Sequence, residues 1–168
     1  MQNHFELFGL LPAFSVEAEA LERSYREIQS KVHPDRFAHA GDAERRASLQ
    51  WTTRVNEAYR TLKDPVQRAK HLLELHGVDL AFETNTAMPQ DFLMQQMELR
   101  ESLENARDAN ALDALRKDLV HEKTELERQI ADSIDQQHDY AGAAGLVRKL
   151  QFLDRLDEEI DAAYEEIE

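Results

Sequence analysis

An apolar stripe that a proline interrupts is the strongest constraint on how this chain can fold. The apolar side chains before the proline recur at helical spacing: Leu21, Tyr25, Ile28 and Val32. Pro34 disfavours helical backbone at the residue before it, so the helix has to end at Val32. Ser15 is a suitable N-cap for its start. We therefore expect a helix from about Ser15 to Val32, followed by a loop from His33 to Gly41.

A second apolar face follows this loop and indicates a helical hairpin. Its residues again share helical spacing: Ala47, Trp51, Val55, Ala58, Tyr59 and Leu62. Asp42 is placed to cap this second helix, and Trp51 is expected in the core. The sequence Asp64-Pro65-Val66-Gln67 then predicts a third helix, with Asp64 as its N-cap and Gly77 as its end.

The second half of the chain contains three more stretches with helical periodicity. We expect helices near 90–107, 110–136 and 140–167, which would pack as a three-helix bundle. The segment from Gly77 to Pro89, between the third helix and this bundle, is mixed in composition and turn-prone. The sequence therefore predicts an all-α protein with a first domain at 1–76, a linker at 77–89 and a bundle at 90–168.

Charge divides the chain at about the same place. Residues 1–82 carry 11 Lys and Arg against 12 Asp and Glu, whereas residues 83–168 carry 9 against 22. The net charge of -14 argues against general nucleic-acid binding.

The sequence has no long apolar run and no signal peptide, so we expect a cytoplasmic protein. It also has no cysteine, which excludes disulfides and thiolate metal sites.

The tripeptide His33-Pro34-Asp35 lies at the expected tip of the hairpin. With its flanking segments LERSYREIQSKVHPDRF and VNEAYRTLKDPVQRA, it resembles the J-domain family, whose members stimulate ATP hydrolysis by DnaK-class chaperones. The resemblance implies that the tripeptide contacts the chaperone, together with a basic helix face that docks on an acidic partner surface. The basic residues at matching places are Arg23, Arg26, Lys31 and Arg36. Val32 departs from the family pattern, because an aromatic residue usually precedes the histidine.

Two other interpretations of this region stay open. Arg23, Arg26 and Lys31 could be no more than a solvated helix face, since acidic residues share that surface. A metal site built from His33, Asp35 and His39 is conceivable, but no regular spacing aims the three side chains together.

The later segments AKHLLELHGVDLA, DFLMQQMELRESLE and VRKLQFLDRLDEE extend the resemblance along nearly the whole chain. Here the sequence resembles the HscB family, the J-proteins of bacterial iron-sulfur cluster assembly. This resemblance implies two partners: the dedicated chaperone HscA, recruited by the J-domain, and the cluster scaffold protein IscU, bound by the C-terminal bundle. It implies no cofactor, no metal and no catalytic residue.

The first helix of the bundle has two apolar faces. Phe92, Leu99, Leu103 and Ala106 gather on one, and Leu93, Met94 and Met97 on nearly the opposite one. Only one face can line the core, unless the helix touches two neighbours and both are buried. The family's scaffold-binding residues map onto the second face, its borders and the last helix: Leu93, Met94, Met97, Glu98, Glu101 and Phe152. Asn105 stands where relatives can carry an acidic residue.

These observations favour a co-chaperone that stimulates a chaperone ATPase and delivers an iron-sulfur scaffold to it. The alternatives are a helical binding protein with an inert J-like half, a J-protein for another client, and a small metal-dependent enzyme. The remaining histidines form no HExxH or comparable ligand pair, which makes the enzyme the weakest of these.

Overall fold

The computed structural model describes residues 2–80 and 90–167, and within these ranges the chain is helical without a strand. The all-α prediction is thus confirmed. The chain divides into two compact units, Met1–Leu72 and Leu73–Glu168. Most of the linker expected at 77–89 lies outside the described residues, so its bounds stay a prediction.

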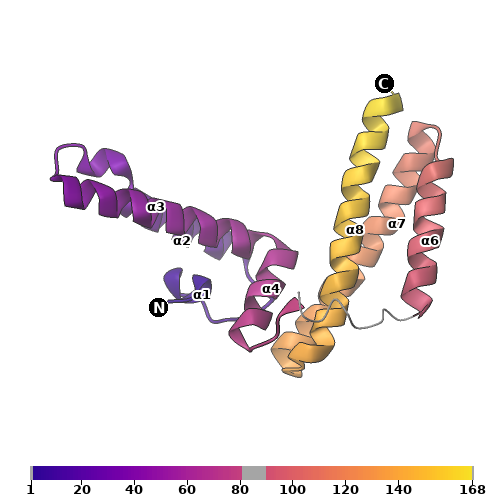
Figure 1. Cartoon of the computed structure of the whole chain (residues 1–168), viewed down its shortest axis with the longest axis horizontal. Helices are drawn as coiled ribbons and strands as arrows, with labels where there is room; N and C mark the ends of the chain where they lie inside the picture. The colour runs from indigo at the N-terminus through magenta and orange to yellow at the C-terminus, as the bar shows by residue number, and fades with distance from the viewer. Residues whose placement is uncertain (1, 81–89, 168) are drawn as a thin grey trace. The chain divides into compact units, whose positions relative to one another are not determined.

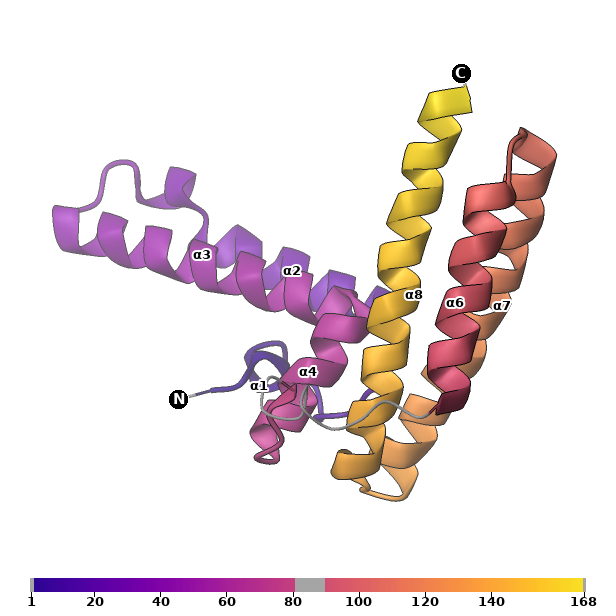
Figure 2. The ribbon, with the colours of Figure 1, turned by 45° about the vertical axis from the view of Figure 1, so that its right-hand side comes forward.

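The first unit is built on an antiparallel pair of long helices that lie side by side (Figures 1 and 2). Its elements are α1 (His4–Leu7), α2 (Ala18–Val32), a 3-10 turn (Pro34–Phe37), α3 (Asp42–Lys63) and the start of α4 (Pro65–Leu75). The buried apolar side chains are concentrated between α1, α2, α3 and α4: Phe5, Leu21, Val55, Ala58, Leu62, Val66, Ala69 and Leu72. The stacked rings of Tyr25 and Tyr59, 4.0 Å apart, join α2 to α3.

The ends of these helices are correct to within three residues. α2 ends at Val32 as Pro34 requires, but its N-cap is Glu17 rather than Ser15, and Glu17 makes no side-chain cap bond. At the start of α3 the N-cap is Gly41, which moves Asp42 to the first helical position. Asp64 does cap α4, because its Oδ2 accepts the backbone N–H of Gln67 at 2.9 Å.

The expectation that Trp51 belongs to the core is wrong. Its side chain is 41% exposed, although it lies on the apolar stripe of α3. The guanidinium of Arg54 stacks over its ring, 5.2 Å from the centroid, so the indole packs at the surface under a cation.

The second unit contains the three expected helices. They are α6 (Gln90–Asn105), α7 (Ala109–Ala131) and α8 (Tyr140–Ile167), with a π turn (Asp132–Gln136) ending α7. α7 and α8 share the main core, whose fully buried side chains include Leu112, Leu119, Ile130, Leu150, Leu153, Leu156 and Ile160. At the edge of this core, Lys123 on α7 bridges Asp154 at 2.7 Å and Asp157 at 3.3 Å on α8.

Candidate partner-binding sites

The His33-Pro34-Asp35 tripeptide forms the turn that leaves the end of α2. His33 has extended backbone (φ -56°, ψ 135°), the conformation that a following proline favours, and Pro34 opens the 3-10 turn. Asp35 donates its backbone N–H to His33 Nδ1 at 3.2 Å. In the neutral imidazole, this acceptor role at Nδ1 leaves the N–H on Nε2.

Both polar side chains of the tripeptide are available to a partner. The His33 side chain is 47% exposed and that of Asp35 is 94% exposed. The tip therefore offers one N–H donor at Nε2 and one carboxylate acceptor on a backbone that proline stiffens.

Two hydroxyls of α3 hold the base of this turn. Ser48 Oγ donates to the carbonyl oxygen of Val32 at 2.5 Å, and Thr52 Oγ1 donates to the same oxygen at 3.3 Å. On the other side, Arg36 reaches back to the carbonyl of Ser30 at 3.3 Å. Neither Ser48 nor Thr52 was predicted to act here; the signal that could have indicated them is a pair of hydroxyl residues at i, i+4 spacing next to the apolar stripe of α3.

The four predicted basic residues are exposed around the tip and along α2. Two have acidic neighbours one helical turn away: Arg26 pairs with Glu22 at 2.7 Å, and Lys31 with Glu27 at 3.6 Å. Arg23 makes no ion pair with any residue that the structure describes. Because such exposed pairs contribute little stability, these cations can be redirected to a partner at small cost.

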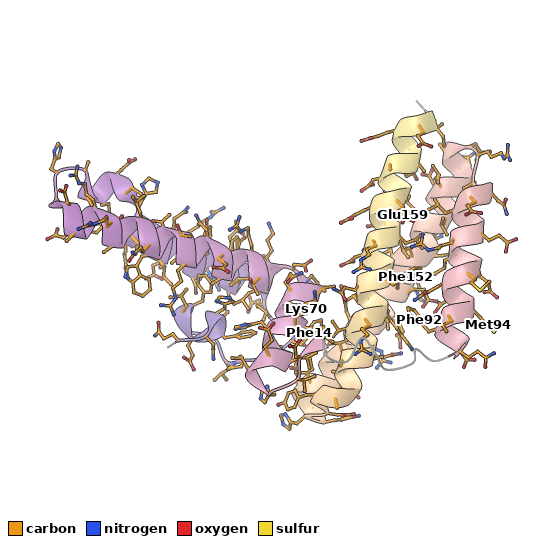
Figure 3. All side chains as sticks on the ribbon, in the orientation of Figure 1. Phe14, Lys70, Phe92, Met94, Phe152 and Glu159 are labelled. Atoms are coloured by element: carbon orange, nitrogen blue, oxygen red, sulfur yellow. The ribbon has the colours of Figure 1, made fainter. Side chains whose placement is uncertain are left out.

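The outer face of α6 is an exposed apolar surface. Leu93 is 44% exposed, Met94 54% and Met97 73%, whereas Phe92 on the opposite face is 3% exposed. Glu98 and Glu101 are exposed beside them. We call these five residues, Leu93, Met94, Met97, Glu98 and Glu101, the α6 patch. Figure 3 shows Met94 on the side of α6 turned away from α8, with Phe92 and Phe152 between the two helices.

Phe152 differs in position from the other predicted scaffold-binding residues. It is only 9% exposed, and its ring meets that of Phe92 edge to face with centroids 5.8 Å apart. Arg100 covers it, with the guanidinium 5.3 Å from the ring centroid, and pairs with Glu159 at 3.0 Å. Phe152 thus packs against the core side of α6 and supports that helix. The helical periodicity of the sequence does not indicate that Arg100 covers its ring.

One histidine of the first unit is buried enough to change its titration. His71 stacks on His4 with ring centroids 4.3 Å apart, and its Nε2 accepts the His4 backbone N–H at 3.3 Å. Burial, and secondarily the positive charge of His4, lowers the pKa of His71 from 6.5 to about 4. The neutral imidazole is therefore the form that docks α1.

Within residues 2–80 and 90–167, no three histidine or carboxylate side chains are grouped so as to hold a metal ion. Among those same residues, no helix combines the length and apolar character needed to cross a membrane.

Solved structures reproduce this architecture. Chaperone HscB from Vibrio cholerae matches with a TM-score of 0.87 and 34% identity, covering 99% of this chain and 100% of that one. Human co-chaperone protein HscB matches with a TM-score of 0.92 and 28% identity, covering 96% of this chain and 82% of that one. A helical hairpin with an exposed His-Pro-Asp turn, followed by a helical second domain, defines the class: a J-domain co-chaperone.

Sequence comparison identifies the family within this class. Residues 88–161 match the family described as the HSCB C-terminal oligomerisation domain. A co-chaperone protein HscB homolog from Aromatoleum aromaticum is 49% identical over 170 residues, which cover 99% of this chain and 96% of the relative. A homolog of the same name from Burkholderia multivorans is 50% identical over 169 residues, with the same coverage. The chain belongs to the HscB family of co-chaperones.

Proposed function

We propose that this chain stimulates the ATPase of a DnaK-class chaperone of the HscA type and delivers to it an iron-sulfur cluster scaffold of the IscU type. The observation that carries the proposal is the exposed tripeptide at the end of α2, with the Asp35 carboxylate 94% exposed. The relatives are named co-chaperones, which supports the same role.

The tip acts by contact. His33 Nε2–H and the Asp35 carboxylate supply one donor and one acceptor, and Arg23, Arg26, Lys31 and Arg36 add a basic surface beside them. This combination suits an acidic partner surface that presents its own donor and acceptor groups. ATP hydrolysis itself belongs to the chaperone, so the chain needs no catalytic residue, cofactor or metal of its own.

The α6 patch is the proposed scaffold-binding surface. Leu93, Met94 and Met97 form an apolar centre with an acidic rim, as in protein interfaces generally, and methionine adapts to irregular partners. Burial of each side chain contributes roughly 1.5–3 kcal/mol before the costs of association. Phe152 contributes to this surface by holding α6 in place.

The two arms together suggest a bacterial cytoplasmic adaptor: the patch presents the client while the tip triggers the hydrolysis that traps it on the chaperone. His33→Gln should abolish stimulation of an HscA-type ATPase yet leave scaffold affinity, measured by calorimetry, unchanged. If stimulation persists in His33→Gln at saturating concentration, the tripeptide is not the trigger and the proposal fails.

A further inference from the structure

The carbonyl of Val32, the last residue of α2, is one of the terminal carbonyls that a helix leaves without an intrahelical partner. A helical carbonyl accepts from the amide four residues ahead, or three in a 3-10 turn. Here the amide of Arg36 donates to the His33 carbonyl at 3.0 Å, and the amide of Asp35 donates to His33 Nδ1 at 3.2 Å. Pro34 has no N–H at all. No backbone amide of the turn is therefore left to donate to the Val32 carbonyl.

Ser48 and Thr52 of α3 satisfy this carbonyl from the other helix of the hairpin, at 2.5 and 3.3 Å. A serine or threonine inside a helix commonly bonds its own i-4 carbonyl, as Thr53 does with Leu49 at 3.0 Å. Ser48 instead donates across to α2, and it is 3% exposed, so water does not compete for its hydroxyl. Both bonds are partly buried, so removing the two donors would leave this carbonyl oxygen partly shielded from water and without a partner, which is destabilising.

The position of this carbonyl gives the two hydroxyls a specific role. The Val32 carbonyl belongs to the peptide plane that joins α2 to His33, so its direction sets the direction in which the tripeptide leaves the helix. Two donors one helical turn apart on α3 fix that plane against a rigid element.

We propose that Ser48 and Thr52 are positioning residues for the chaperone contact: they orient the His33-Pro34-Asp35 turn through the carbonyl of Val32. This inference rests on the proposed function, because it concerns how well the tip is prepared for its partner. Removing both hydroxyls leaves the hairpin folded but lets the turn sample other directions. Binding to the chaperone then also has to order the turn, which lowers the affinity.

The test uses the full chain with Ser48→Ala and Thr52→Val together, which removes both hydroxyls at nearly constant volume. The concentration giving half-maximal stimulation of a purified HscA-type ATPase should rise roughly three- to tenfold, the ratio that corresponds to one or two lost hydrogen bonds. By NMR, the carbonyl carbon of Val32 should shift and the Asp35 amide should exchange faster with solvent. Thr52→Ser, which keeps its hydroxyl, should match wild type in all three measurements.

Val55→Ala is the matched control for lost stability. Val55 is fully buried on α3 and its side chain has no donor for the Val32 carbonyl, so this variant should melt earlier without changing the half-maximal concentration or the Val32 signal. A wild-type half-maximal concentration in the double variant would overturn the inference, whatever the NMR signals show, and so would an equal rise of that concentration in Val55→Ala. If the wild-type chain itself fails to stimulate the ATPase, the proposed function falls, and the NMR readouts still decide whether the hydroxyls hold the turn.

Discussion

Phe92 on α6 and Phe152 on α8 meet edge to face, with their ring centroids 5.8 Å apart. Lys149 stacks over Phe92 and Arg100 over Phe152, at 5.5 and 5.3 Å from the ring centroids. This contact fixes which side of α6 faces the bundle. Because Phe92 points inward, the opposite side of the helix, with Leu93, Met94 and Met97, is left exposed.

Replacing Leu93, Met94 and Met97 together with alanine should weaken scaffold binding on the order of tenfold or more, because the apolar centre of the interface is lost. Melting should stay within a few degrees of wild type, since the three side chains are largely exposed and alanine favours helix. Calorimetric titration with the scaffold and thermal unfolding give the two values.

Val120→Ala provides the matched control, because Val120 is an apolar residue on α7 that is 53% exposed outside the patch. Its scaffold affinity should equal that of wild type. A large loss of stability in the triple variant would mean that these side chains are core residues.

Phe152→Ala should instead lower the free energy of unfolding by about 3–5 kcal/mol, the usual cost of removing a buried aromatic side chain. The loss follows from its 9% exposure and its contacts with Phe92 and Arg100. Urea unfolding of the full chain measures it. A variant that keeps wild-type stability but loses scaffold affinity would assign Phe152 a direct contact with the partner.

Acidification should destabilise the first unit through His71. Its pKa is about 4 in the folded protein and 6.5 when unperturbed, so the folded state binds fewer protons between these values. Stability is therefore present in full above about pH 6.5 and is lost as the pH falls from 6.5 to 4. His71→Gln keeps a polar group opposite the His4 amide but cannot titrate, so it should lose less stability across this window.

Urea unfolding at pH 7.5 and 4.5 measures the difference, with His39→Gln, an exposed histidine, as the control that should follow wild type. An equal loss in wild type and His71→Gln would exclude His71 as the group responsible.

The basic face should make chaperone coupling depend on salt. Exposed charges are screened over about 10 Å at 0.1 M ionic strength, so the concentration needed for half-maximal ATPase stimulation should rise with added salt. Arg23→Glu should raise that concentration at low salt and flatten its salt dependence. Lys117→Glu, an exposed charge reversal on α7, should leave both unchanged; equal effects of the two reversals would point to net charge rather than to a docking face.

The helices and the His33-Pro34-Asp35 turn could be predicted from the sequence, because each depends mainly on residues that are close together in the chain. Pro34 alone places the end of α2, and Asp64 with Pro65 places the start of α4. The caps predicted at Ser15 and Asp42 were misplaced by two residues and one residue, because more than one polar or glycine residue can start each helix.

The remaining features depend on contacts between distant residues. The Ser48 bond to Val32, the burial of Phe152 under Arg100 and the exposure of Trp51 beneath Arg54 all follow from packing that periodicity does not specify. The π turn at Asp132–Gln136 also continues an apolar stripe, with Ile134 buried, and so looks like ordinary helix in sequence.

The most direct test of the proposed function is the ATPase rate of a purified HscA-type chaperone with this chain, with IscU-type scaffold, and with both. We predict that the stimulation by chain and scaffold together exceeds the sum of their separate stimulations. This synergy should be lost in His33→Gln and in the Leu93, Met94 and Met97 triple alanine variant. Merely additive rates, or synergy that survives both variants, would contradict the proposed function.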